Sequence, residues 1–149
     1  MSWDAYVDQL MDSNTLEYAC ILDNSEYALC GASKGFELKV FNKSFDLDDS
    51  GKSIEINEKD IIISIFKNKG IVPNPPGIFL NGEKYFLVDF DKDTNVCYLS
   101  KPNGGACIAM TNKCVIIGTW NKNINENHNH GSCNITIQDF ANNFINYGY

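Results

Sequence analysis

The segment GIFLNGEKYFLV, from Gly77 to Val88, decides how the rest of the chain is read. Two apolar runs, Gly77–Leu80 and Lys84–Val88, flank the pair Asn81-Gly82. Asn-Gly between apolar runs predicts a β-hairpin with a type I′ turn, because that turn needs a positive φ at both central residues. The β-branched and aromatic residues of both runs favour a pleated, partly buried surface.

Short runs of strand-forming residues lie on both sides of this hairpin, and each ends at a polar or glycine-containing break. The strands predicted from them are Tyr18–Leu22, Tyr27–Cys30, Phe36–Val40, Ser53–Ile56, Val96–Ser100, Ala106–Met110 and Lys113–Thr119. The sequence DLDDSG, from Asp46 to Gly51, predicts a turn, so that the strands on either side of it form a small projecting hairpin.

Three stretches show helical spacing of apolar residues. The first has Ser2 as its N-cap and an apolar face of Trp3, Tyr6, Val7, Leu10 and Met11. The second is predicted at Glu58–Lys67, capped by Asn57. The last opens at Ser132 or Asn134, ends at Gly148, and carries an apolar stripe of Ile137, Phe140, Ala141, Phe144 and Ile145. An antiparallel sheet with a few helices packed on it, an α+β fold, is therefore expected as a single domain over residues 1–149.

Composition excludes several classes of function. A formal net charge of -7 argues against nucleic acid or an anionic membrane as the main partner. No apolar run is long enough for a membrane span, and the N-terminus lacks the features of a signal peptide, so we expect a cytosolic protein. In that compartment the six cysteines are expected to be free thiols.

Two chemical sites are conceivable near the last helix. His128, His130 and Cys133 could act as metal ligands, but no fourth ligand has suitable spacing, so solvated histidines are the preferred interpretation. Cys133 lies near a helix N-terminus, where the dipole can lower a thiol pKa, which allows the hypothesis of a thiol enzyme. No orienting third residue or oxyanion motif accompanies it.

Aromatic residues gather at the two ends of the chain. Trp3 and Tyr6 lie on the first predicted helix, and Tyr147 and Tyr149 lie at the end of the last. If the two helices are adjacent, these rings could form an exposed surface of the kind that binds polyproline II segments. The alternative is that the rings only pack the helices on the sheet.

Four of these pieces, in this order and spacing, resemble the profilin family. They are the opening MSWDAYVDQL, the hairpin GIFLNGEKY, the loop SKPNGGACI, and Gly131-Ser132-Cys133-Asn134 followed by an amphipathic helix. The segment from about Phe36 to Asn74 is longer than in plant or animal profilins. Its acidic hairpin is similar to an insert of apicomplexan and other protist profilins.

The resemblance implies a central antiparallel sheet, with the terminal helices together on one face and further short helices on the other. It implies a cytoskeletal protein without cofactor or catalytic activity, monomeric on its own, that binds actin monomers and proline-rich segments of formin-like proteins. The low positive charge implies at most weak phosphoinositide binding. The alternative within the family is a scaffold of the same fold that does not bind actin.

The resemblance also implies which residues bind. The proline-rich site would use Trp3, Tyr6, Tyr27, Asn143 and Tyr149, where Tyr27 replaces a usual Trp and Asn143 a usual His or Tyr. The actin site would use Lys84, Lys101, Gly131, Ser132, Asn134, Gln138 and Asp139. Both lysines are expected to be exposed, because each lies beside a glycine-containing turn.

Overall fold

A computed structural model describes residues 3–44, 53–72 and 77–149. Among these residues, seven antiparallel strands form a sheet in the order β2-β1-β9-β8-β7-β6-β5, and β3 pairs with β4 in a separate hairpin. The elements are α1 (Trp3–Met11), β1 (Tyr18–Asp23), β2 (Leu29–Ala32), β3 (Val40–Ser44), β4 (Ser53–Asn57), α2 (Glu58–Lys67), β5 (Ile78–Leu80), β6 (Glu83–Asp91), β7 (Val96–Lys101), β8 (Gly104–Met110), β9 (Cys114–Asn121) and α3 (His130–Asn146).

The central hairpin, β5 with β6, forms as the Asn-Gly pair predicts. Asn81 has φ 52° and Gly82 φ 82°, the two positive values that a type I′ turn requires. The pairing of Leu80 with Glu83 and of Ile78 with Tyr85 follows directly from this two-residue turn. Ile78 and Tyr85 are buried, so the turn fixes the register that places them in the core.

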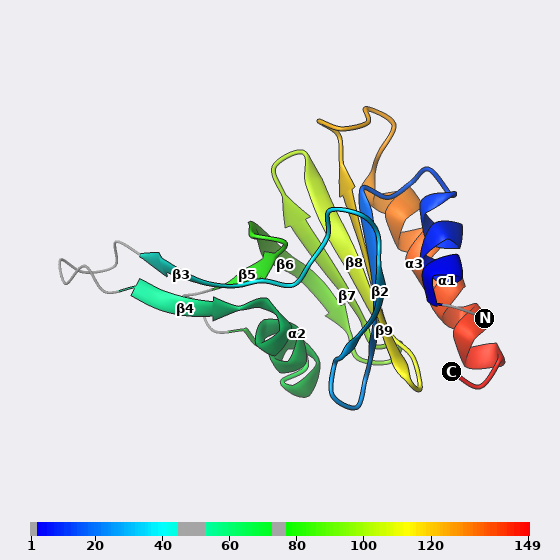
Figure 1. Ribbon diagram of the computed structural model, residues 1–149, viewed down its shortest axis with the longest axis horizontal. Coiled ribbons are helices and arrows are strands. Elements are labelled where there is room, and N and C mark those ends of the chain that lie inside the picture. Colours follow the sequence, from blue (N-terminus) through cyan, green and yellow to red (C-terminus); the bar gives the residue numbers. More distant parts are fainter. Residues whose placement is uncertain (1–2, 45–52, 73–76) are drawn as a thin grey trace.

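Helices cover the sheet on both faces (Figure 1). The helices α1 and α3 lie side by side on one face, and α2 lies on the other. Neighbouring residues of the central strands serve different cores, because side chains alternate across a strand. On β8, Cys107 packs beneath α1 and α3, whereas Ala106 and Ile108 pack towards α2. The expected α+β fold, with the terminal helices together, is confirmed.

The last helix begins earlier than either predicted position. Asn129 is its N-cap, with φ −155° and ψ 162°, and the Asn129 Oδ1 accepts a hydrogen bond from the Ser132 N–H at 2.8 Å. Asparagine caps a helix as well as serine does, so the sequence offered several candidates. The apolar stripe is confirmed for all its members except Ile145, which is exposed.

The strand predicted at Phe36–Val40 is wrong, because β3 only begins at Val40. Phe36 is buried in the core on the α2 side, and its N–H donates to the Ser33 carbonyl. The Lys39 N–H donates to the carboxylate of Glu58 at 2.9 Å. The Glu58 side chain and the turn at Ser33 thus pair backbone N–H groups that a neighbouring strand would otherwise pair.

The hairpin of β3 and β4 projects from the body of the molecule, as Figure 1 shows. Its ladder runs from Val40 opposite Asn57 to Ser44 opposite Ser53. The turn predicted at 46–51 and the N-cap predicted at Ser2 lie outside the described residues. Asn57 caps α2 as predicted, since its Oδ1 accepts from the Asp60 N–H.

The thiol and histidine predictions have different outcomes. All six cysteines are free, as expected. His128, however, is buried with 4% of its surface exposed, and its Nδ1 accepts a hydrogen bond from the Asn121 N–H at 3.2 Å. The prediction of two solvated histidines is therefore wrong for His128, which secures the loop before α3, and right for His130, which is exposed.

Two candidate binding faces

An aromatic platform forms where α1 meets the C-terminal part of α3, and it consists of Trp3, Tyr6, Phe144 and Tyr149. The Trp3 ring lies 5.8 Å from Tyr6, 6.1 Å from Phe144 and 6.3 Å from Tyr149, measured between centroids. Most of these pairs are edge-to-face, the arrangement that the ring quadrupole favours. The rings therefore hold one another in fixed orientations.

A groove of about 400 Å³ runs along this platform. No charged residue lines it, and its rim carries the amides of Gln9 and Asn143. Its lining is completed by Tyr6, Phe140, Phe144, Tyr147 and Tyr149. The aromatic surface predicted from the sequence is thus partly packing, because Trp3 and Tyr6 are half-buried, and partly an accessible groove, because Tyr147 and Tyr149 are exposed.

Tyr27 does not join this platform. It has a positive φ of 58° in the loop before β2, and its ring packs against the core on the α2 side of the sheet. On β2, the half-buried Cys30 packs on the same core beneath α1 and α3 as Trp3 and Tyr6 do, and the Gly31 backbone lies against Trp3 and Val7. Sequence reasoning did not single out Cys30, because the sequence around a short irregular turn does not reveal which residues of β2 lie on the α1 side of the sheet.

The second face is the part of the sheet that α1 and α3 leave uncovered. On β6, Lys84, Phe86 and Val88 are all exposed, and the Lys84 Nζ lies 5.4 Å from the centre of the Phe86 ring. Exposed fractions of 59% for Phe86 and 65% for Val88 are high for apolar side chains on a sheet. A row of this kind on a sheet face is typical of an interaction surface.

A pocket of about 570 Å³ separates this row from α3. Asn134 and Gln138, two of the predicted actin-site residues, line it from the helix, and the Gln138 Nε2 donates to the Tyr98 hydroxyl at 3.0 Å. Val88 and Trp120, which sequence reasoning did not single out, line it from the sheet. The alternation of β6 could have indicated Phe86 and Val88, but not which face of the strand is uncovered.

The other predicted actin-site residues lie outside this pocket. Gly131 and Ser132 are half-buried in the first turn of α3, and Asp139 is exposed beside Gln138. Lys101 contradicts the expectation of exposure, since only 7% of its side chain is accessible. Its Nζ pairs with Glu83 at 2.9 Å and lies 5.2 Å from the centre of the Tyr85 ring.

Lys101 and Lys84 consequently leave the sheet on opposite faces. Tyr85 belongs to the core on the α2 side, and Lys84, its neighbour on β6, points the other way. The glycine-containing turn beside Lys101 does not expose the lysine, because the Lys101 side chain folds back and packs over Gly104. Of the two lysines, only Lys84 lies on the uncovered sheet face.

Cys133 cannot serve as an activated thiol. Its side chain is fully buried between α3 and the sheet, and its Sγ donates to the Gly118 carbonyl at 3.6 Å. Burial raises the pKa of Cys133 to about 12, the reverse of what a nucleophile needs. The thiol-enzyme hypothesis for Cys133 is therefore wrong. Nor do the described residues contain a cluster of three or more side chains suited to a metal.

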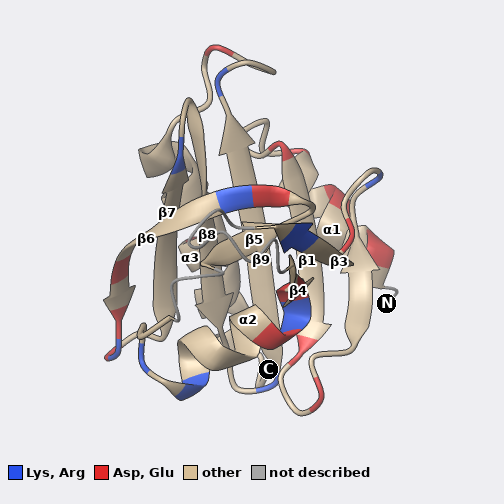
Figure 2. Ribbon diagram, turned by 90° about the vertical axis from the view of Figure 1, so that its left-hand side faces the viewer, with Lys and Arg blue, Asp and Glu red and all other residues tan. Residues whose placement is uncertain are grey.

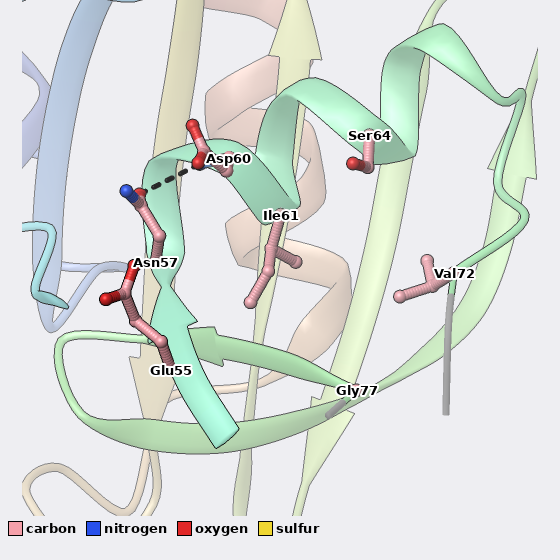
Figure 3. Close-up of a pocket in the computed structure, with 7 residues that line it drawn as sticks. All are labelled: Glu55, Asn57, Asp60, Ile61, Ser64, Val72 and Gly77. Atoms are coloured by element: carbon pink, nitrogen blue, oxygen red, sulfur yellow. Dashed lines mark hydrogen bonds between the residues drawn. The ribbon is translucent and has the colours of Figure 1, made fainter. Parts of the chain in front are cut away.

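Another cavity, of about 200 Å³, lies beside α2 and contains none of the predicted site residues (Figure 3). Glu55 and Asp60 give it an acidic lining, and Asn57 is engaged as the helix cap.

Within the described part of the chain, no helix has the length and apolar character needed to cross a bilayer.

Comparison with known proteins agrees with the geometry of the fold. The profile of the profilin family matches residues 1–149. The profilin of Tetrahymena pyriformis is 30% identical over 152 residues, covering 99% of this chain and 98% of that protein. The crystal structure of Acanthamoeba castellanii profilin II matches with a TM-score of 0.74 and 20% identity, over 99% of this chain and 100% of that one.

Two further solved structures of the same fold are complexes. Mouse profilin IIa with a double repeat from the FH1 domain of mDia1 matches with a TM-score of 0.65 and 16% identity, covering 100% of both chains. A complex of LokiProfilin2 with rabbit actin matches with a TM-score of 0.63 and 14% identity, covering 98% of both chains. The family match over the whole chain and the Tetrahymena relative decide the relationship: this chain belongs to the profilin family.

Proposed function

We propose that this chain binds actin monomers on its uncovered sheet face and proline-rich segments in its aromatic groove, and thereby brings actin monomers to formin-like proteins. The groove along the aromatic platform is the observation that carries the proposal. The complexes of the mouse and Loki profilins, one with an FH1 repeat and one with actin, support both halves. The function is one of binding, in the cytosol and at the actin cytoskeleton, and it requires no catalytic step.

The groove suits a polyproline II segment for physical reasons. Such a segment is preformed and carries no internal hydrogen bonds, so its rings can stack on fixed aromatic faces at a low entropic cost. Its carbonyls are unpaired, and the amides of Gln9 and Asn143 on the rim can donate to them. The absence of charge from the lining favours proline over acidic or basic residues.

Two adjacent asparagines of α3 offer a matched test of this site. Asn143 lines the groove and Asn142 does not, although both are exposed. In a Trp120→Phe background, Trp3 is the one remaining tryptophan and reports binding of poly-L-proline by fluorescence. Asn143→Ala is expected to weaken binding about two- to tenfold, the equivalent of one hydrogen bond, and Asn142→Ala to leave it unchanged. Equal effects of the two variants, or no response to peptide, would contradict the site.

The uncovered sheet face suits actin as a partner. Lys84 supplies a positive charge for the approach to acidic actin, and Phe86 and Val88 supply apolar area to bury. Covering one end of the monomer by this face would block addition to one filament end and permit addition at the other. The residues proposed to contact actin are then Lys84, Phe86, Val88, Asn134 and Gln138.

Two exposed valines allow a controlled test of the actin face. Val88 lies on this face with 65% exposure, and Val40 lies on the projecting hairpin with 61%. A charge placed at the centre of an interface typically costs at least about 2 kcal/mol, so Val88→Asp is expected to weaken sequestration of actin monomers at least about tenfold. Val40→Asp changes the chain's charge equally and is expected to sequester normally. If the unmodified chain sequesters no actin, the chain is instead a scaffold of this fold.

A further inference from the structure

The turn between β8 and β9 reaches the last residue of the aromatic platform. The hydroxyl of Thr111 donates to the main-chain oxygen of Tyr149 at 2.8 Å, and the Lys113 N–H donates to the same oxygen. The Lys113 Nζ also lies 5.4 Å from the centre of the Tyr149 ring. Backbone and ring of Tyr149 are therefore both held by residues 111–113, which lie far from α1 in the sequence.

This turn is itself braced from the neighbouring hairpin. The Asn24 side chain donates from its Nδ2 to the carbonyls of Thr111 at 3.1 Å and Asn112 at 2.9 Å, and its N–H donates to the Lys113 carbonyl at 2.9 Å. Thr111 is buried, with 6% of its surface exposed, so its hydroxyl cannot exchange freely between Tyr149 and water. A continuous set of hydrogen bonds thus runs from the β1–β2 loop to the platform.

One other backbone hydrogen bond of Tyr149 leads to α3. Tyr149 follows Gly148, which has φ 90°, and its N–H donates to the Phe144 carbonyl at 2.8 Å, so α3 holds the N–H of Tyr149 while Thr111 and Lys113 hold its main-chain oxygen. Its side chain is 41% exposed, although it meets Trp3 at 6.3 Å and Phe144 at 5.8 Å. Immobilising a mobile ring on ligand binding costs conformational entropy and so weakens affinity, whereas a ring that is already fixed has no such cost.

We propose that the β8–β9 turn is part of the proline-rich site: Thr111, supported by Asn24, is a positioning residue that holds Tyr149 edge-on to Trp3 and so pre-organises the groove. The ligand class is that of the proposed function, on which this inference rests. Thr111 touches no peptide. It acts on binding through Tyr149 alone.

A double-mutant cycle tests that dependence directly. Thr111→Val removes the hydroxyl at constant shape and is expected to weaken binding of poly-L-proline about three- to tenfold by calorimetry, the equivalent of one hydrogen bond. Thr111→Ser keeps the hydroxyl and is expected to bind normally. In a Tyr149→Ala background, Thr111→Val should cause no further loss, because the ring that Thr111 positions is gone. An equal loss in both backgrounds, or no loss in either, overturns the proposal.

Two additions keep the test decisive. The Thr111 Oγ1 also accepts from the buried Cys114 N–H at 3.0 Å, so Thr111→Val also lowers the stability of the fold by removing that acceptor. If it does not fold, Asn24→Ala, which removes only the brace, takes its place in the cycle with the same expected pattern. If the unmodified chain binds no peptide, the proposed function fails, and the anchor is judged without ligand: amide exchange at Lys113 should accelerate in the variant, while the remote Gly70 amide stays unchanged. Unaltered exchange at Lys113 overturns the anchor itself.

Discussion

Cys30 is the one cysteine of the six that is not buried. Burial, followed by the nearby charge of Asp23, raises the pKa of its thiol, so Cys30 is accessible but not activated. Cys133 is both inaccessible and shifted, since burial raises its pKa to about 12. A thiol reacts only if it is both exposed and deprotonated, and Cys30 differs from Cys133 mainly in being exposed.

We therefore expect iodoacetamide to modify Cys30 first in the folded chain, and slowly. The rate should rise with pH, because a thiol whose pKa is raised forms its reactive thiolate only at higher pH. Peptide mapping by mass spectrometry after timed quenching measures this, and labelling in urea, where all six react, is the control. Early modification of Cys133 would contradict the buried position that the structure gives it.

Cys30 also determines where a larger ring would improve the platform. Because Cys30 is half-buried on the same side of the sheet as Trp3 and Tyr6, Cys30→Trp should extend the aromatic surface and tighten binding of poly-L-proline about two- to tenfold, the range of one aromatic pair. Tyr27→Trp should have no such effect, because Tyr27 packs on the α2 side of the sheet. Titration of both variants under the same conditions distinguishes them, and tighter binding by Tyr27→Trp alone would show that the loop before β2 lies differently.

At the scale of elements, one buried carboxylate joins three segments. Glu58, at the start of α2, has no exposed surface, and its oxygens accept from the N–H groups of Lys39 at 2.9 Å and of Asn81 and Gly82 at 2.7 Å each. Three backbone donors offset the cost of burying the charge. The base of the projecting hairpin, the central turn and α2 are thereby fixed relative to one another.

Glu58→Gln should lower the free energy of unfolding by about 1–3 kcal/mol, because the amide puts an NH₂ group where a backbone donor needs an acceptor. The midpoint of urea unfolding measures this loss. Glu55→Gln makes the same change at an exposed position of β4 and is expected to leave the midpoint unchanged. An equal shift in both variants would mean that charge alone, and not the three hydrogen bonds, is responsible.

Elements whose signals are local were predictable from the sequence, and those that depend on distant partners were not. The Asn81-Gly82 turn and the Asn57 cap each need only a few neighbouring residues, and both formed as predicted. The start of β3 depends on Glu58, a residue far along the chain that the sequence presents as an ordinary helical glutamate.

The candidate sites follow the same division. Trp3, Tyr6 and Tyr149 come together because two amphipathic helices must bury their stripes on one face of the sheet. The exposure of Lys101 was mispredicted because Glu83 and Tyr85 approach it from another strand. The positions of Tyr27 and Cys30 depend on the register of a short loop, which periodicity does not specify.

At the scale of the whole molecule, the charge is acidic and dispersed. The formal net charge is -7, and in Figure 2 lysines and acidic residues are scattered over the visible face. Lys101 is already paired with Glu83 and lies on the α2 side of the sheet, opposite the uncovered face. Anionic lipid headgroups therefore meet a chain of net negative charge whose lysines are dispersed along the ribbon in this view.

We expect phosphoinositide vesicles to retain the chain weakly, and only at low ionic strength, because scattered exposed charges are screened within about 10 Å at 0.1 M salt. Co-sedimentation with vesicles containing and lacking phosphoinositide, at low and physiological salt, measures this. Vesicles of neutral lipid alone are the control. Retention that persists at physiological salt would require a basic site that the net charge and Figure 2 do not suggest.

The helix α3 contributes to both faces, with Asn134 and Gln138 on one and Asn143 and Tyr147 beyond them at the other. Gln138 and Asn143 are five residues apart, which corresponds to about 7.5 Å of helix rise. If the chain has the proposed function, this single rigid helix fixes the distance between the bound actin monomer and the bound proline-rich segment. The orientation of a bound actin monomer relative to the proline-rich segment is then set by the helix. The length of the proline-rich segment sets only the effective concentration of the monomer at a growing filament end.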